Sequence, residues 1–130
     1  MFSYVCLGTN DLPRAVIFYD AVMAPLGHMR CDLDLIRGNA TWGLDDPGPH
    51  LWVTAPFDGA TARAGNGTMV SFLAQSRTQV DAVYSAAIAQ GGVCEGSPGL
   101  RPKYGPTFYA AYLCDPEGNK FTADCYTRES

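Results

Sequence analysis

The sequence contains no run of basic residues and no long apolar segment. Its nine lysine and arginine residues are scattered and the formal net charge is −4, whereas a nucleic-acid-binding surface is basic. A membrane-spanning helix needs about 20 consecutive apolar residues, and no segment approaches that length. The composition therefore argues against nucleic-acid and membrane partners.

Histidine is scarce, and the cysteines show no pairing pattern. The five cysteines are an odd number without any C-x-x-C spacing, which argues against a disulfide framework and against a zinc site. The first residues, MFSYVCLGTNDLP, lack the basic region and the long apolar region of a secretion signal. We therefore expect free thiols and a cytoplasmic location.

Hydrophobic residues, in contrast, make up 47% of the 130 residues, which predicts one compact domain with an extensive core. Within it, residues 4–27 and 69–92 share one pattern of strand, helix cap, amphipathic helix and glycine stop, at a shift of 65 residues. The sequence therefore predicts two copies of one structural module. We expect module one over about residues 1–55, a glycine-rich connector over 56–67 and module two over about 68–130.

Each predicted helix carries one apolar stripe. Asn10 is the predicted N-cap of the first helix, and Ser76 and Gln79 form a predicted capping box at the second. The apolar residues recur at helical spacing in the first helix as Leu12, Val16, Tyr19, Met23 and Leu26, and in the second as Val80, Val83, Ala87 and Ile88. Gly27 and Gly91–Gly92 are the predicted stops.

Short strands separated by turns are predicted after each helix. We expect them over residues 28–34, 38–44 and 50–55 in module one and over 93–96, 107–114 and 119–126 in module two, with a long loop over 96–106. The element order is βαβββ twice, with mostly antiparallel strands and the helices on one face. This predicts an α+β fold in which the two modules form a curved, mixed sheet.

The stretch CDPEGNKFTADC predicts a hairpin whose tight turn places Asp115 opposite Asn119 and Tyr112 opposite Thr122. Because side chains alternate between the faces of a strand, one face is wholly apolar and suits packing under the helices. The other face carries Phe108, Ala110, Tyr112, Thr122, Asp124 and Tyr126. We expect that face to line a cleft for a small molecule, and a dimer interface or additional core remain as alternatives.

Three stretches carry a family resemblance: TNDLPRAVIFYDAVMAPLG, GNGTMVSFLA and YLCDPEGNKFTADC. They resemble the vicinal oxygen chelate superfamily, which includes glyoxalase I, extradiol dioxygenases and the fosfomycin- and bleomycin-resistance proteins. With the doubled topology, the resemblance covers essentially the whole chain. It implies paired βαβββ modules around a cup, often in a homodimer. In metal-dependent members a divalent ion is held there by His, Glu or Gln side chains from the first and last strands of each module.

Carried over by position, these ligands fall on Tyr4, Met69, Thr122 and, less sharply, Trp52. A hard divalent ion prefers carboxylates, carbonyls or imidazoles. The two histidines, His28 and His50, lie near the starts of other strands. We therefore expect no metal ion and no cofactor, and no metal-dependent glyoxalase I activity.

Three hypotheses for function follow. The first is a metal-free protein that binds an apolar or aromatic small molecule in the cup. The second is a lyase or isomerase that uses Asp124 and a tyrosine, because a carboxylate among Tyr112, Tyr126 and Trp52 could have a raised pKa and act as a base. The third is a structural dimerisation module with a filled cup. The predicted substrate-binding residues are Tyr4, Trp52, Thr54, Met69, Ser71, Arg101, Phe108, Tyr112, Thr122 and Asp124.

Overall fold

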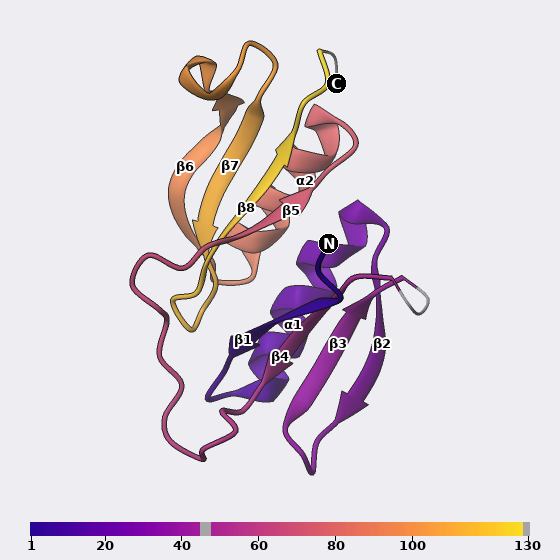
Figure 1. Ribbon diagram of the computed structural model, residues 1–130, viewed down its shortest axis with the longest axis vertical. Helices are drawn as coiled ribbons and strands as arrows, with labels where there is room; N and C mark the ends of the chain where they lie inside the picture. Colours follow the sequence, from indigo (N-terminus) through magenta and orange to yellow (C-terminus); the bar gives the residue numbers. More distant parts are fainter. Residues whose placement is uncertain (45–47, 129–130) are drawn as a thin grey trace.

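The computed structural model of the chain describes residues 1–44 and 48–128. Figure 1 shows two similar units that follow one another along the chain. Module one contains β1 (Tyr4–Gly8), α1 (Leu12–Met23), the short 3-10 helix η1 (Ala24–Leu26), β2 (Met29–Asp34), β3 (Asn39–Gly43) and β4 (His50–Thr54). Module two contains β5 (Val70–Leu73), α2 (Arg77–Ala89), β6 (Val93–Leu100), the 3-10 helix η2 (Pro102–Tyr104), β7 (Tyr109–Cys114) and β8 (Lys120–Cys125).

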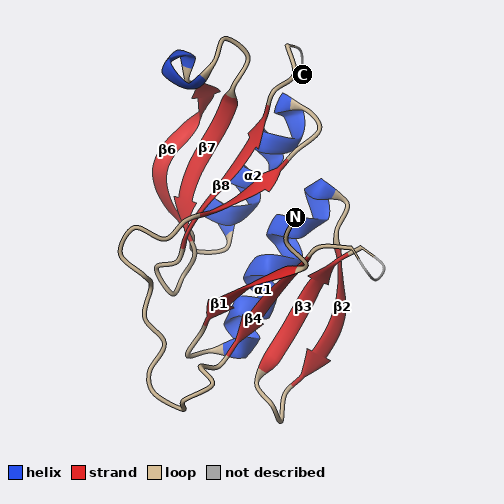
Figure 2. Cartoon of the chain, in the orientation of Figure 1, coloured by secondary structure: helices blue, strands red, loops and turns tan. Residues whose placement is uncertain are grey.

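Each module folds into one four-stranded sheet with a helix on one side. The strand orders are β1-β4-β3-β2 and β5-β8-β7-β6. The β1–β4 and β5–β8 pairs are parallel and the other pairs are antiparallel. Both helices lie behind the sheets in the view of Figure 2. The α+β class and the doubled βαβββ order are confirmed, and the strands form two separate sheets.

The predicted helix stripes form most of the helical contribution to the core. Buried residues of α1 and α2 include Val16, Tyr19, Met23, Val80, Val83 and Ala87. The prediction for Ile88 is wrong, because its side chain is 41% exposed. Ile88 follows Ala87 directly and so lies about 100° further around the helix, beyond the edge of a narrow stripe.

Helix α1 begins one residue later than predicted. Its N-cap is Asp11, whose side chain accepts a hydrogen bond from the Arg14 backbone N–H at 3.2 Å. The predicted cap, Asn10, instead bonds to the connector: its Nδ2 donates to the Ala62 carbonyl at 3.0 Å and its Oδ1 accepts from the Ala62 N–H at 2.7 Å. The Asn10 amide is thus used to hold the connector and does not cap the helix.

Helix α2 begins at the predicted cap. Ser76 Oγ accepts from the Gln79 backbone N–H at 3.1 Å, as expected for a serine cap. Gln79 Oε1 accepts from the backbone N–H of Gln75 at 2.7 Å, one residue earlier than a standard capping box. The serine half of the prediction is therefore confirmed, and the glutamine half is shifted by one residue.

The β7–β8 hairpin has the predicted register, with Tyr112 opposite Thr122 and Ala110 opposite Asp124. Gly118 has a φ of 95°, the left-handed conformation that the turn requires. Strand β6, predicted to end at residue 96, continues to Leu100. Its register against β7 shifts on both sides of Gly96. Irregularities such as β-bulges let a strand continue past residues that do not pair regularly.

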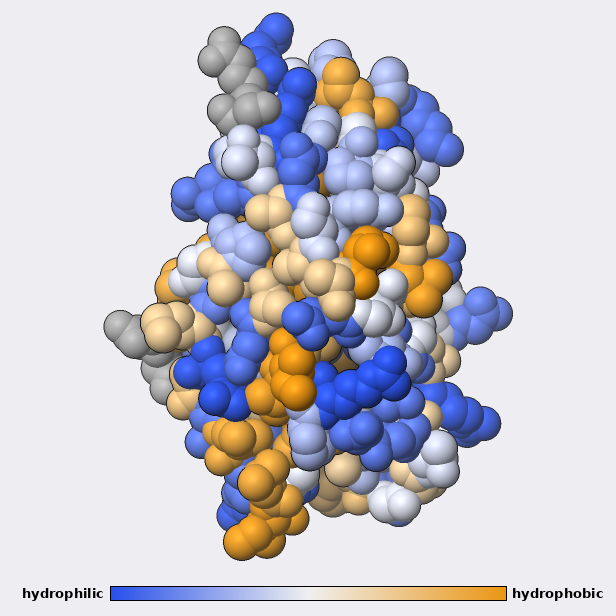
Figure 3. Space-filling view, turned by 180° about the vertical axis from the view of Figure 1, so that it is seen from behind, coloured by the Kyte–Doolittle hydropathy of each residue, from blue (hydrophilic) through white to orange (hydrophobic). Residues whose placement is uncertain are grey.

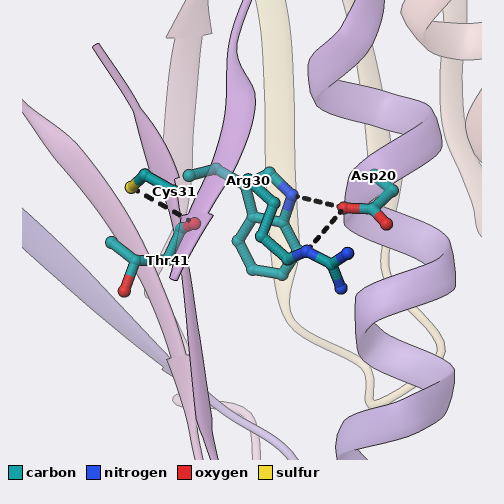
Figure 4. A network of polar contacts seen from close by, with 5 residues as sticks. Asp20, Arg30, Cys31 and Thr41 are labelled. Carbon is teal, nitrogen blue, oxygen red and sulfur yellow. Dashed lines mark hydrogen bonds and ion pairs between the residues drawn. The ribbon is translucent and has the colours of Figure 1, made fainter. Parts of the chain in front are cut away.

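A polar contact fixes α1 to the strands of module one (Figure 4). Asp20 on α1 accepts a hydrogen bond from Trp42 Nε1 on β3 at 2.9 Å and lies 3.8 Å from Arg30 Nε on β2. Next to Arg30 on β2, the Cys31 thiol donates to the carbonyl of Thr41 on β3 at 3.5 Å. The Trp42 side chain is 1% exposed, so its indole N–H needs this internal acceptor.

The β7–β8 turn joins module two to module one. The buried Tyr19 hydroxyl on α1 donates to Asp115 Oδ2 at 2.6 Å, and Asn119 Nδ2 donates to the Gly8 carbonyl at 3.0 Å. Glu117 accepts from the Asn10 backbone N–H at 2.6 Å. Helices α1 and α2 also pack against each other. The turn therefore contributes to the contact between modules.

The helix side of the molecule is shown in Figure 3, where hydrophilic residues cover much of the surface and hydrophobic residues gather in separate patches. This mixture is ordinary for a folded domain. None of the helices among residues 1–44 and 48–128 combines the length and the hydropathy that crossing a bilayer requires.

Candidate functional site

The side of each sheet that faces away from the helices carries most of the predicted site residues. We call these surfaces the module-one face (Tyr4, Thr41, His50, Trp52 and Thr54) and the module-two face (Met69, Ser71, Phe108, Ala110, Tyr112, Thr122, Asp124 and Tyr126). Strand alternation and the register of the ladders assign these residues to one side.

No helix covers the module-two face, yet four of its residues are buried, namely Phe108 and three residues with short side chains. Ala110 is 0% exposed, Thr122 1% and Asp124 7%. Their side chains are short, so larger neighbours on the same face overhang them. Among those neighbours are Phe108 and Tyr126, whose ring centroids lie 5.2 Å apart. The face therefore has a low centre of small side chains and a higher, aromatic margin.

Asp124 lies on this low centre and is the candidate acid–base group. Its carboxylate accepts a hydrogen bond from the Ser71 hydroxyl. Burial raises the pKa of the Asp124 carboxyl, because it disfavours the charged form, and the Ser71 hydrogen bond offsets part of that effect. A carboxyl of this kind can accept a proton at a higher pH than an ordinary aspartate.

One expected neighbour of Asp124 lies in the other sheet. The prediction grouped Asp124 with Trp52, but Trp52 belongs to the sheet of module one, where its ring centroid lies 5.8 Å from that of Tyr4. The residues paired with Asp124 are Ala110 on β7 and Leu73 on β5. The grouping of Trp52 with Asp124 stays a prediction, because the strand pattern assigns residues to faces within a module and does not fix the relation between modules.

Met69 and Thr122 meet on the module-two face. The Thr122 hydroxyl donates to Met69 Sδ at 3.1 Å, and Ser71 pairs with Thr122 along the β5–β8 ladder. On the β7 side of Thr122, the Tyr112 ring carries the Arg101 guanidinium, whose Cζ lies 5.4 Å from the ring centroid. Thr122 thus has Met69, Ser71 and Tyr112 as neighbours, and Tyr112 in turn contacts Arg101.

The module-one face contains a hollow of about 310 Å³ beside Trp52. Thr41 and His50 also line it, and neither was among the predicted site residues. The Thr41 hydroxyl is buried without a hydrogen-bond partner among the described residues. Thr41 lies opposite Trp52 on the β3–β4 ladder. A predicted register for these two strands would therefore have identified Thr41 as a site residue. Thr54 lies at the far end of β4, where its hydroxyl donates to the Ala55 carbonyl at 2.9 Å.

A groove of about 420 Å³ separates the edge strands β1 and β5. Tyr4, Met69 and Ser71 line it, so residues of the two first strands do share one space. Its other walls include the exposed side chains of Phe2 and Leu73. These two lie outside the predicted set, because a single exposed apolar residue carries no site signal in a sequence.

The four positions at which the family carries metal ligands hold side chains that do not fit a hard divalent ion. Tyr4 packs on Trp52, and the Thr122 hydroxyl donates a hydrogen bond to Met69 Sδ. Hydroxyl, thioether and indole groups are poor ligands for such an ion. Among residues 1–44 and 48–128, no group of three or more His, Cys, Asp and Glu side chains is arranged to hold a metal. The donor set and its internal contacts therefore do not match the family's metal centre.

Comparison with solved structures identifies similar chains of full length. A glyoxalase/bleomycin resistance protein from Albidiferax ferrireducens T118 is 39% identical, with a TM-score of 0.86 over 98% of this chain and 99% of that chain. A glyoxalase/bleomycin resistance protein/dioxygenase family enzyme from Burkholderia phytofirmans PsJN is 24% identical (TM-score 0.71, 96% and 98%). A structure described as lactoylglutathione lyase from Agrobacterium tumefaciens is 21% identical (TM-score 0.66, 96% and 92%). No family model and no curated protein matches the chain.

Proposed function

Because the chain belongs to the glyoxalase/bleomycin resistance family of the vicinal oxygen chelate superfamily, we propose that it binds a small apolar or aromatic ligand without a metal ion. The observation that carries this proposal is the module-two face. Its buried centre of Ala110 and Thr122 lies among larger aromatic side chains, including Phe108 and Tyr112. Such a surface suits a flat ligand.

The metal-free part of the proposal is tested by elemental analysis of protein purified without a chelator. We expect much less than one divalent ion per chain, because the side chains at the four family positions are unsuited to such an ion. About one tightly bound ion per chain, retained through dialysis, would overturn this part. A bound ion would leave the proposed position of the ligand to be tested separately.

The ligand-binding part is tested with naphthalen-2-ol as the probe, followed by amide shifts in a ¹⁵N–¹H spectrum. We expect saturable shifts centred on Thr122 and Tyr112. Ala110→Val adds bulk to the low centre and should weaken binding. Ala40→Val is the matched control, because Ala40 is also 0% exposed but faces the core of module one. Shifts spread over other surfaces, or equal effects of both variants, would overturn the proposal.

A homodimer and a cytoplasmic location belong to the same proposal. Strands β1 and β5 are sheet edges that border the groove between the modules, and unpaired strand edges favour pairing with another chain. Five free cysteines favour a reducing compartment. Light scattering should give twice the chain mass of 14.0 kDa, and a mass of one chain at micromolar concentration would contradict the dimer.

A second candidate function is a lyase or isomerase reaction in which Asp124 acts as the base. The observation that favours it is the buried Asp124 carboxyl, which accepts a hydrogen bond from Ser71 and whose pKa is raised by burial. Since a fold neighbour is described as lactoylglutathione lyase, the test is interconversion of lactoylglutathione with methylglyoxal and glutathione. Turnover that Asp124→Asn abolishes would establish an enzyme, whereas turnover unchanged in that variant would exclude Asp124 as its base.

A further inference from the structure

The Arg101 guanidinium lies on a platform built by module two. A Cβ atom added at Gly99 would lie 3.1 Å from Arg101 Nη1, and one added at Gly96 would lie 3.1 Å from Nη2 and 3.2 Å from the Tyr112 ring. The guanidinium also lies over that ring, with Cζ 5.4 Å from its centroid, and Nη2 donates to the Ser97 carbonyl at 2.7 Å. The two glycines of β6 thus leave the space that this cation occupies.

A second cation approaches the same ring. Lys120 Nζ lies 5.9 Å from the Tyr112 centroid. Within the described part of the chain, the ion pairs are those of Arg30 and Arg37, so neither Arg101 nor Lys120 has an acidic partner. Glu95, on β6, accepts a weak hydrogen bond from the Cys114 thiol at 3.4 Å. Two like charges beside one ring are favourable when a bound anion lies between them.

The opposite charge lies further along the same face. Asp124 follows Thr122, the partner of Tyr112, by two residues of β8, which is about 7 Å along a strand. Ser71 donates to Asp124 Oδ2, and Oδ1 accepts no hydrogen bond from the described residues. A carboxylate with one free oxygen therefore lies beyond Tyr112 and Thr122 from the two cations.

From this arrangement we infer that the ligand carries an anionic group at one end, bound by Arg101 and Lys120, and a hydrogen-bond donor or cation at the other, bound by Asp124, across a flat apolar middle part. This inference rests on the proposed binding function and specifies its ligand class. A carboxylate suits the planar guanidinium, because the two groups can form paired hydrogen bonds. A small aromatic ω-amino acid has these features.

Four para-substituted benzenes of similar size test the inference by calorimetry on the full chain: 4-(aminomethyl)benzoate, 4-methylbenzoate, 4-methylbenzylamine and 4-methylbenzyl alcohol. We expect 4-(aminomethyl)benzoate to bind tightest and the neutral alcohol weakest. Hydrogen bonds to charged groups account for a difference of about tenfold for each charged end.

The variants assign each end of the ligand. Arg101→Gln should weaken both benzoates about tenfold and leave 4-methylbenzylamine unchanged, and Asp124→Asn should weaken both amines and leave 4-methylbenzoate unchanged. Gly99→Ala keeps the Arg101 charge and shifts the guanidinium by a few tenths of an ångström, so it should weaken both benzoates less than Arg101→Gln does. Arg37→Gln is the control, because it removes an equal charge from the exposed β2–β3 turn of module one.

The outcomes separate this inference from the proposed function. If all four probes bind equally and no variant matters, the aromatic binding proposal stands and the two-charge inference is overturned. If the alcohol alone binds, the same conclusion holds. If no probe binds at millimolar concentration to wild-type protein of unchanged thermal stability, both are overturned. Binding that Arg37→Gln weakens as much as Arg101→Gln would show a net-charge effect and overturn the assigned site.

Discussion

Replacing Tyr19 with phenylalanine should weaken the contact between the two modules. The Tyr19 hydroxyl donates to Asp115 Oδ2 at 2.6 Å, and the two residues are 0% and 4% exposed. Phenylalanine keeps the ring, whose neighbours Trp42 and Phe121 have centroids 5.7 and 6.3 Å away. The substitution therefore removes one buried hydrogen bond and little packing.

The magnitude follows from what remains around Asp115. A hydrogen bond to a charged group contributes about 1.5–3 kcal/mol. Asp115 retains the backbone N–H groups of Glu117 and Asn119, each at 2.9 Å, and the Asn119 side-chain amide at 3.0 Å. Because the carboxylate keeps these donors, we expect the free energy of unfolding to fall by about 2 kcal/mol. The melting temperature of a chain of this length should fall by about 8 °C.

Tyr109→Phe is the matched control for this prediction. The Tyr109 hydroxyl also donates to an aspartate at 2.6 Å, but its acceptor, Asp81, is exposed and lies in the same module. Its loss should cost less than about 1 kcal/mol. Urea unfolding followed by circular dichroism measures both variants. If Tyr19→Phe costs no more than Tyr109→Phe, burial of the inter-module bond is not what stabilises it, and the reasoning is refuted.

Three further predictions concern Asp124, Gly118 and Tyr109. Because burial raises the pKa of Asp124, folded protein loses stability as pH rises from below about 4 through that pKa. Asp124→Asn should therefore be more stable than wild type at pH 7, by a margin that shrinks at pH 3.5; a margin independent of pH would contradict this. Gly118→Ala, at a φ of 95°, should cost about 1–2 kcal/mol in thermal unfolding, and Gly118→Asn less; equal losses would exclude backbone strain as the cause. The hydrogen bond to Asp81 and burial raise the pKa of Tyr109 to about 12, so between pH 10 and 12 wild type should lose more stability than Tyr109→Phe; parallel losses would refute the assignment.

Local rules were sufficient to predict most of the fold. The register of the β7–β8 hairpin follows from its turn, because a three-residue loop with Gly118 in the left-handed conformation fixes which residues pair. The doubled order of elements follows from the repeat and from helical and strand periodicity. The exact cap of α1 did not follow, since Asn10 bonds to Ala62, a residue whose position depends on the tertiary structure.

The candidate site was predictable within a module and less so between modules. Alternation correctly placed Thr122, Asp124 and Tyr112 on one face. It could not show that Trp52 packs on Tyr4 in the other sheet, because strand patterns contain no information about how two sheets are oriented. The platform under Arg101 was also hidden, since it depends on β6 continuing through irregular positions that the sequence pattern assigned to a loop.

The β7–β8 hairpin carries two sets of side chains with different roles: one set holds the turn and the contact with module one, and the other lies on the helix-free face. Asp115 and Asn119 are buried in the turn and bond to Tyr19 and to the Gly8 carbonyl of module one, so they constrain the fold. Thr122 lies on the helix-free face, where its hydroxyl bonds to Met69. A different side chain at position 122 changes that face without touching the contacts between modules. The turn therefore identifies the family, whereas the chemistry has to be inferred from the residues of the face, where threonine and methionine occupy positions that a metal site would need.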